Sequence, residues 1–513
     1  MKKMIGAAAL LSALLCSAAA YAQIPVSDGE TLFFDLGDIP NTGYIQVSAS
    51  DRYTPEIGYG FAHLTPVKNV EANGDGPYSD AVAFDFAQTG TENTFNVDVP
   101  NGLYQVTIHA GNITTMSIDM EGYYTIMDMT SSGAVASTEI LVEDGQLNIA
   151  PVAGKPNTEY SISTIEIKRL GTAEARRTRL FIAGDSITST YYPLYFDTEL
   201  DPGHRGGWGQ MIGNYLPSNI YVQNYATGGQ CAKGFLNDGQ FAAVEHFIEA
   251  GDYFMIGFGI NDQVDSNEDE FYQSMTEMVQ RVIAKGAVPI IFTTEGKLTD
   301  FDTDGVCYQP GRWYKTTAKK VAQEQRIHYI DLHDLASAYF TAIGYDGAER
   351  LYWINWSGEQ DTLHASREGA GQMARLIVEE LCRQGLTAFE GNIYDYGVSN
   401  DITLKSSGVY DGNLINVQNL SPYPQNIKLL VNCYNERGAV IGSNIINWTL
   451  PAYDVLDPLK RDTILLDEYC TNCKAYLIKD GLIQDWNGFS VQPDFSVPYD
   501  TAQRLFADSI VLE

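Results

Sequence analysis

Apolar and polar residues alternate along the first third of the chain, which predicts β-strands. The clearest run places apolar residues at Phe95, Val97, Val99, Tyr104, Val106 and Ile108. Pro100–Gly102 interrupts this run with residues that favour a turn. A period of two between turn signals is typical of antiparallel strands. We therefore expect residues 23–172 to form a β-sandwich, followed by a short charged linker.

From residue 178 the pattern changes. Short, continuously apolar runs occur at residues 180–183, 220–222, 253–256, 288–292 and 329–330. Such runs suit parallel strands that are buried on both faces. Helical spacing between the runs is seen at Phe271, Met275, Met278, Val282 and Ile283, and again at Met373, Leu376, Ile377 and Leu381 after a capping Ser366. Residues 178–388 are thus predicted to form a three-layer α/β/α domain with a parallel sheet.

The chain returns to alternation after about residue 390. Ile427, Leu429 and Val431 alternate with polar residues, and Asn435–Gly438 is a favourable hairpin turn. Residues 390–513 are therefore predicted to form a second, smaller β-sandwich. The whole chain is expected to be multidomain, with the α/β/α domain flanked by two β-sandwiches.

The first 22 residues have the features of a secretory signal peptide. Two lysines precede an apolar stretch at residues 7–15, and Ala20–Ala22 is a small-x-small cleavage site. The apolar stretch is shorter than the roughly 20 residues that a membrane span needs. Lipid attachment at Cys16 is the alternative, which the bulky Leu15 disfavours. We expect the mature protein to be exported to the periplasm or beyond, without insertion into a membrane.

Charge excludes two classes of partner. The chain has 65 acidic and 32 basic residues, so its net charge is −33. A surface of this charge repels nucleic acids and anionic membranes. Neither is expected as a partner.

The cysteines do not suggest a disulfide scaffold or a zinc site. There are seven in 513 residues, and Cys470 and Cys473 form a C-x-x-C pair without the second pair that a zinc site needs. An exported protein can carry disulfides. Cys433 could pair with either Cys470 or Cys473, and the sequence leaves this choice open.

Four polar segments follow the predicted strands or precede the last helix. Ser186, Gly229 and Asn261 come after the first three strands, and Asp361 and His364 come before the helix at Ser366. Parallel α/β sheets bind ligands at the carboxyl ends of their strands. A serine nucleophile needs a base to take its proton and donors to hold the oxyanion that forms. These segments contain residues of each type.

Each segment alone has an ordinary structural explanation. Asp185 and Ser186 could cap a helix, and Gly229 and Asn261 could be turn residues. A single Asp-x-x-His is weak evidence for a catalytic pair. The joint occurrence of the four segments, in chain order and at strand ends, nevertheless favours acyl-transfer chemistry.

The same segments resemble the sequence blocks of the SGNH or GDSL hydrolase superfamily. The matching segments are Gly184–Ser186, Gly229, Gly259–Asp262 and Asp361–His364. Trp208–Gln210 further resembles the rhamnogalacturonan acetylesterase branch. Gln230 and Cys231 depart from that branch, which usually has an arginine and a serine there. The resemblance covers about residues 178–388.

The resemblance implies a flavodoxin-like fold and a role for each site residue. Ser186 would be the nucleophile, His364 the general base and then acid, and Asp361 the residue that orients His364. The backbone N–H groups of Ser186 and Gly229 and the side chain of Asn261 would form the oxyanion hole. No cofactor or metal is implied.

The resemblance also extends to the N-terminal region. Phe33–Gly37 and Gly58–Phe61 are similar to segments of galactose-binding-like modules. Such a module would hold a polymer or support the fold, and the sequence assigns it no calcium.

The leading hypothesis is a secreted esterase that removes acetyl groups from an acetylated polysaccharide or oligosaccharide. Pectic rhamnogalacturonan is the favoured substrate, although its anionic backbone would be repelled by this protein unless a local basic patch intervenes. One alternative is a lipid or aryl esterase of the same superfamily. Another is a non-catalytic glycan-binding protein with a decayed esterase core.

Overall fold

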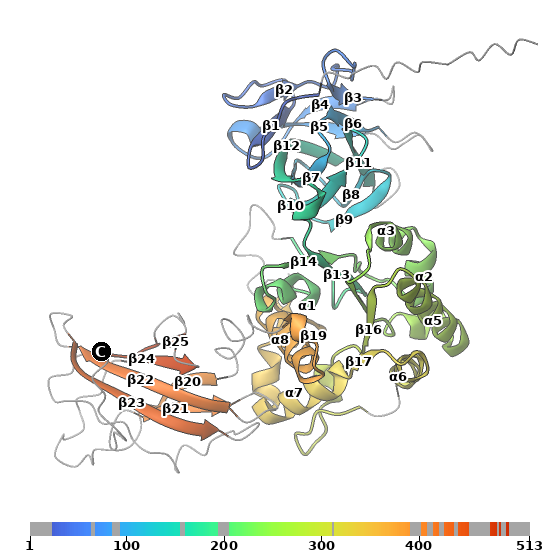
Figure 1. The fold of residues 1–513 in the computed structure, drawn as a ribbon. Coiled ribbons are helices and arrows are strands. Elements are labelled where there is room, and N and C mark those ends of the chain that lie inside the picture. The colour runs from blue at the N-terminus through green and yellow to red at the C-terminus, as the bar shows by residue number, and fades with distance from the viewer. Residues whose placement is uncertain are drawn as a thin grey trace, which may run out of the picture.

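The computed structural model describes most of the chain between residues 23 and 389 and seven strands beyond it. The described ranges are 23–62, 67–84, 93–153, 160–192, 205–309, 312–355 and 357–389, followed by the backbone of strands between 402 and 491. The expected signal peptide, residues 1–22, lies outside them. Figure 1 shows an N-terminal β region, a central α/β domain and C-terminal β-sheets.

The N-terminal region is a sandwich of two sheets that enclose one apolar core. The seven-stranded sheet contains β1 (Thr31–Leu36), β2 (Ile45–Val47), β4 (Val67–Glu71), β5 (Asp80–Phe84), β7 (Gly102–Ala110), β10 (Val135–Val142) and β12 (Tyr160–Gly171). The five-stranded sheet has the order β3 (Tyr59–Phe61), β6 (Phe95–Asp98), β11 (Gln146–Ala153), β8 (Met116–Met120) and β9 (Tyr123–Met129). The alternating residues at 95–99 and 104–108 all lie in this core.

The central domain is built on a five-stranded parallel sheet. Its strands are β13 (Thr178–Ala183), β14 (Ile220–Asn224), β15 (Tyr253–Ile256), β16 (Val288–Phe292) and β17 (His328–Ile330), in the spatial order β14-β13-β15-β16-β17. All five predicted apolar runs fall within these strands. The order reverses beside β13, so the loops after β13, β14 and β15 meet at a switch point.

Helices cover both faces of this sheet and form the three layers that the sequence predicts (Figure 1). They are α1 (Trp208–Met211), α2 (Ala232–Asn237), α3 (Gln240–Phe247), α4 (Asp262–Asp265), α5 (Glu268–Ala284), α6 (Trp313–Gln325), α7 (Leu332–Glu349) and α8 (Arg367–Arg383). The hairpin β18 (Tyr352–Ile354) and β19 (Gln360–Ala365) precedes α8, and short 3₁₀ helices lie at 76–78, 173–175, 212–215, 298–300 and 387–389.

Two predicted helices are present as α5 and α8. Ser366 caps α8 by accepting a hydrogen bond from the Gly369 N–H at 3.2 Å. The four apolar positions predicted for α8 are buried. In α5 the buried stripe ends at Val282, and Ile283 is 43% exposed, because one residue further turns it by about 100° away from the sheet.

The N-terminal sandwich packs directly against the central domain. The Tyr225 hydroxyl donates to the backbone oxygen of Tyr124 at 2.8 Å. The Glu139 N–H donates to the Tyr221 hydroxyl at 3.1 Å, and the Glu139 carboxylate pairs with Arg177. Met127 of β9 belongs to the apolar core of the central domain. The interface is therefore both polar and apolar, and it involves strand β9 in particular.

The C-terminal strands form two separate antiparallel sheets. β20 (Ile402–Ser407) pairs with β21 (Leu414–Asn419), and the larger sheet contains β22 (Gln425–Tyr434), β23 (Val440–Leu450), β24 (Asn472–Lys479), β25 (Leu482–Ile483) and β26 (Phe489–Val491). The predicted hairpin joins β22 to β23, but its turn at 435–438 lies outside the described residues. Cys433 is opposite Cys473 in the pairing of β22 with β24, and Cys470 lies outside the described residues.

Among the helices that the structure describes, none has the length and apolar character of a membrane span.

Candidate active site

Ser186, His364 and Asp361 form one hydrogen-bonded chain, although they come from distant parts of the sequence. Ser186 lies in the turn that follows β13, and the other two lie on β19. The Ser186 Oγ is 2.9 Å from His364 Nε2, and His364 Nδ1 is 2.9 Å from an Asp361 carboxylate oxygen. This geometry lets His364 accept the serine proton at one nitrogen while the other nitrogen donates to Asp361.

Local backbone geometry holds Asp361 in its ionised form. Its carboxylate accepts the N–H groups of Leu363 at 2.7 Å and of His364 at 2.8 Å. Burial alone would raise the pKa of Asp361, but these bonds and the one from the His364 ring outweigh it, so that the pKa lies below its ordinary value. A carboxylate rather than a carboxylic acid therefore faces the imidazole.

His364 is held in its neutral form more firmly than a histidine in water. Burial lowers its pKa, the positive charge of Arg205 lowers it further, and the bond to Asp361 opposes both effects only in part. A general base must be unprotonated to accept a proton. The lowered pKa of His364 therefore extends the range of pH in which it can act towards the acid side.

The loop Thr227–Gln230, which we call the glycine loop, follows β14 beside Ser186. The Thr227 N–H donates to Gly184 O at 3.2 Å, and the Gln230 N–H donates to Thr227 O at 3.4 Å. Gly229 has a φ of +78°, a left-handed conformation that suits glycine. No acceptor in the described part of the chain lies within hydrogen-bonding distance of the Gly229 N–H. This donor is available to a ligand.

Asn261 and the backbone of Ser186 supply two further donors. The Asn261 side-chain nitrogen donates one hydrogen to Gln230 O at 3.0 Å, which ties it to the glycine loop and leaves its second hydrogen available. The Ser186 N–H also has no acceptor among the described residues. The structure thus joins Ser186, His364 and Asp361 in one hydrogen-bonded chain, and it ties Asn261 to the glycine loop, which is itself bound to Gly184.

Two buried aspartates in the same segments support the loops instead of facing a ligand. Asp185 accepts the Ile187 N–H at 3.0 Å, and burial raises its pKa to about 7. Asp262 accepts the Ala232 N–H at 3.1 Å, and burial raises its pKa to about 6. The expected alternative, that Asp185 and Ser186 cap a helix, does not apply, because the described residues after Ser186 form a turn.

Sequence reasoning missed Tyr191 beside the serine. Its hydroxyl donates to Ser186 O at 2.7 Å. The Gln210 side chain holds Tyr191 by two bonds to its backbone, at 3.1 Å from the Tyr191 N–H and 2.9 Å to the Tyr191 oxygen. The Trp208–Gln210 motif indicated that Gln210 belongs to the site. Nothing in the sequence indicated that Tyr191 is the residue that Gln210 binds.

Two positively charged residues near His364 were also missed. The Arg205 guanidinium lies 4.3 Å from the centre of the Tyr191 ring and 5.3 Å from that of Trp353. Lys297 is half-buried, and its charge, like that of Arg205, lowers the pKa of His364. Neither residue forms an ion pair among the described residues, although acidic residues outnumber basic ones two to one in this chain.

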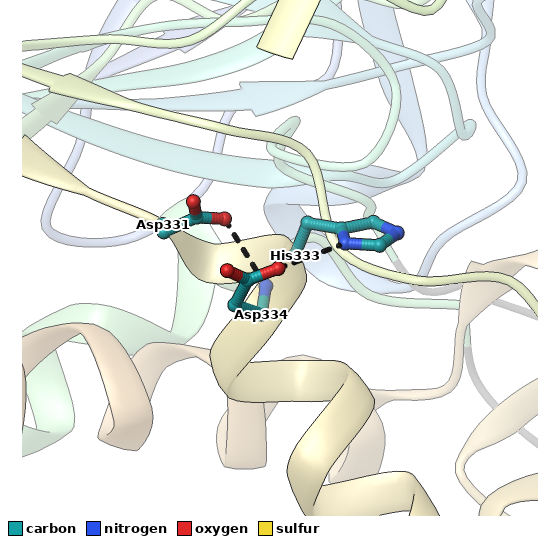
Figure 2. Close-up of side chains that lie close together, drawn as sticks. All are labelled: Asp331, His333 and Asp334. Atoms are coloured by element: carbon teal, nitrogen blue, oxygen red, sulfur yellow. Dashed lines mark hydrogen bonds and ion pairs between the residues drawn. The ribbon is translucent and has the colours of Figure 1, made fainter. Parts of the chain in front are cut away.

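A second group of Asp and His side chains lies at the start of α7. Asp331, His333 and Asp334 offer ligand atoms within 4.8 Å of one another (Figure 2). The ammonium group of Lys315 lies among them, 3.2 Å from Asp331 and 3.4 Å from His333 Nδ1, and pairs with Asp334. A positive charge of the protein itself therefore occupies the position that a metal ion would take.

Comparison with known proteins gives matches for both described domains. Residues 32–168 match the family described as Beta-agarase/YXIM esterase-like, galactose-binding domain-like, and residues 180–377 match the GDSL-like Lipase/Acylhydrolase family.

Three relatives are informative. The uncharacterized esterase YxiM of Bacillus subtilis is 40% identical over 394 residues, which are 76% of this chain and all of that protein. The crystal structure of YxiM covers 70% of this chain and all of its own, with a TM-score of 0.65 and 41% identity. The rhamnogalacturonan acetylesterase RhgT of Bacillus subtilis is 30% identical over 219 residues, which are 40% of this chain and 91% of that protein.

Proposed function

Because the chain belongs to the GDSL family of lipases and acylhydrolases and is a carbohydrate esterase, we propose that it removes acetyl groups from pectic rhamnogalacturonan through an acetyl-serine intermediate. The observation that carries this proposal is the continuous hydrogen-bonded chain from Asp361 through His364 to Ser186, beside three available donors.

The proposed reaction has two steps. Ser186 Oγ attacks the acetyl carbonyl carbon while its proton passes to His364 Nε2, and the oxyanion is held by the Ser186 and Gly229 N–H groups and the Asn261 amide. His364 then returns the proton to the sugar oxygen, which leaves as an alcohol. Water, activated by the same nitrogen, attacks the acetyl-serine, and acetate is released with the Ser186 hydroxyl restored. No step needs a cofactor or a metal ion.

Two observations support a pectic substrate despite the net charge of −33. Relatives of this chain include proteins named as rhamnogalacturonan acetylesterases. Arg205 and Lys297, which form no ion pair among the described residues, place two positive charges near His364, where both lower its pKa. Positive charges at this position would attract the carboxylate of a uronic acid in a protein that otherwise repels anions.

The alternative of a lipid or aryl esterase has less support, because an uncharged acyl chain makes no ion pair with Arg205 or Lys297, which have none among the described residues. We further propose that the protein is exported, on the basis of its signal-like N-terminus. The C-terminal strands are proposed to form a small sandwich that accompanies the enzyme.

The test is acetate release from acetylated rhamnogalacturonan by the wild-type protein and by Ser186→Ala. We expect release by the wild type and a loss of about 10⁴- to 10⁶-fold in kcat for the variant. Acetylated xylan and longer acyl esters serve as comparison substrates. Equal rates on acetylated xylan would remove the pectic assignment, and release by Ser186→Ala at the wild-type rate would remove the nucleophile.

A further inference from the structure

Arg205, beside the active site, differs from the other arginines that lie over aromatic rings. In the described part of the chain six guanidinium groups lie over such a ring, those of Arg169, Arg177, Arg179, Arg205, Arg281 and Arg375. Five of them also form a hydrogen bond or an ion pair with the protein. The guanidinium of Arg205 forms neither among the described residues. Its positive charge is therefore available to a ligand.

The backbone and two rings fix the position of Arg205. The N–H of the next residue, Gly206, donates to Ala365 O at 3.1 Å. The guanidinium carbon lies 4.3 Å from the centre of the Tyr191 ring and 5.3 Å from that of Trp353. A side chain that is held in this way loses little further freedom when it binds a ligand.

The same contacts place Arg205 beside the nucleophile and the base. Ala365, which accepts the bond from Gly206, directly follows His364 in the chain. The hydroxyl of Tyr191, whose ring lies against the guanidinium, donates to Ser186 O at 2.7 Å. The Tyr191 side chain therefore contacts both Arg205 and Ser186. A substrate of one or two sugar rings can span this separation.

The chemistry of Arg205 suits a carboxylate. Its Nε is buried without a hydrogen-bond partner, so the protein desolvates part of this cation without compensating it. An anion bound at the terminal N–H groups offsets that cost. A guanidinium can donate two parallel hydrogen bonds to a carboxylate, which gives it a geometric preference for this group. In an acetylated polysaccharide, uronic acids carry such carboxylates.

We propose that Arg205 binds the carboxylate of a uronic acid close to the acetyl group, so that the protein prefers substrates in which this carboxylate is free. The inference rests on the proposed function and specifies its substrate. A methyl ester of the uronic acid is uncharged and cannot form the ion pair. Where the polymer is methyl-esterified, hydrolysis of that ester, which consumes water and leaves methanol, a proton and the carboxylate, must therefore come first.

The net charge of the chain gives this preference a diagnostic sign. At −33, the protein as a whole repels a polymer with free carboxylates more strongly than the uncharged methyl ester of the same polymer. Overall charge alone therefore predicts faster acetate release from the methyl ester. A local site for a carboxylate predicts the opposite order.

The experiment measures acetate release by the full-length protein from acetylated rhamnogalacturonan with free carboxylates and from the same polymer after methyl esterification. We expect kcat/KM to be about 10- to 100-fold higher for the free acid, mostly through a lower KM, because the ion pair forms in the ground state and the transition state alike. No release from either polymer would sink the proposed function, and this inference with it. Equal release, or faster release from the methyl ester, overturns this inference alone.

Arg205→Gln should remove most of the preference, because the amide keeps a donor but not the charge. The ratio of kcat/KM for the two polymers is compared at one pH, so the effect of Arg205 on the pKa of His364 cancels. The matched control is Arg177→Gln. Arg177 lies over a ring as well, 4.9 Å from the centre of Tyr221, but it pairs with Glu139. Its variant should keep the wild-type ratio.

Arg205→Lys keeps the inference testable if Arg205→Gln does not fold. Lysine retains the charge but lacks the planar fork, so the ratio should fall by at least about threefold. A lowered ratio in either folded variant, with the wild-type ratio in Arg177→Gln, supports the proposal. An unchanged ratio in either, or an equal loss in Arg177→Gln, overturns the assignment of the carboxylate site to Arg205.

Discussion

The central domain contains two groups of Asp and His side chains that look alike in sequence and differ in what touches the imidazole. In one, His364 lies between Asp361 and Ser186 Oγ. In the other, His333 lies beside Asp334 and the ammonium group of Lys315, and its Nε2 is 3.8 Å from Asp300. The first has a nucleophile and three available donors, and the second is filled by a lysine.

This difference teaches that residue type alone does not define a catalytic pair. An Asp lies beside a His in both places, but only His364 is hydrogen-bonded to its Asp and has a hydroxyl against its other nitrogen. Around His333, the ammonium group of Lys315 instead neutralises the carboxylates of Asp331 and Asp334. The contrast can be tested by making equivalent changes in the two groups.

The largest difference is expected for the aspartates. Asp361→Asn should lower kcat by about 10⁴-fold, because an amide no longer enforces the tautomer of His364 that accepts the serine proton. Asp331→Asn keeps the oxygen that caps α7 and should leave kcat within about twofold. Steady-state kinetics on an acetyl ester compare the two variants. Similar losses in both would mean that the group at α7 takes part in the reaction.

A smaller loss is expected when one oxyanion donor is removed. Asn261→Ala should lower kcat by about 10²- to 10³-fold, since its amide donates to charge that develops only in the transition state. The control is Asn267→Ala, which removes the cap of α5 and should cost about 1 kcal/mol of stability. Its kcat should not change. An unaltered kcat in Asn261→Ala would take Asn261 out of the oxyanion hole.

The group at α7 should respond in stability rather than in turnover. Lys315→Met leaves Asp331 and Asp334 without their shared positive charge and should lower the free energy of unfolding by about 1–2 kcal/mol. Urea denaturation measures this loss, and the acetyl ester assay should show wild-type kcat. A large loss of activity with normal stability would contradict the structural role of Lys315.

The smallest effect concerns the dependence of activity on pH. The charge of Arg205 lowers the pKa of His364, so Arg205→Gln should raise it. Because protonation of His364 inactivates the base, activity is lost as the pH falls through that pKa, and a higher pKa moves the acid limb of kcat/KM to higher pH. Arg281→Gln is the control, because Arg281 pairs with Glu245 and is not among the groups that shift the pKa of His364. A limb that stays in place would show that Arg205 does not act on His364.

Much of the fold could be predicted because it depends on periodicity. The apolar runs at 180–183 and 288–292 are buried parallel strands, and the alternating residues at 95–99 line the sandwich core. Ser186, Gly229 and Asn261 could be indicated because they follow predicted strands, and Asp361 and His364 because they lie three residues apart just before a predicted helix. The exposure of Ile283 could not be predicted, since an apolar residue at the edge of a helical stripe does not reveal on which side the stripe ends.

Other features depend on contacts between distant residues, which no local pattern records. Tyr191 and Arg205 were missed because their roles come from lying beside Ser186 and His364 in space.

The sequence by itself determined the order of strands and helices, the residue types at the ends of the strands and the net charge, because these follow from local periodicity and composition. The tertiary structure alone decided which Asp and His meet a serine and which positive charges lie beside the base. The physical reason is that each of these depends on a hydrogen bond or a charge interaction that acts over a few ångströms between segments far apart in the chain.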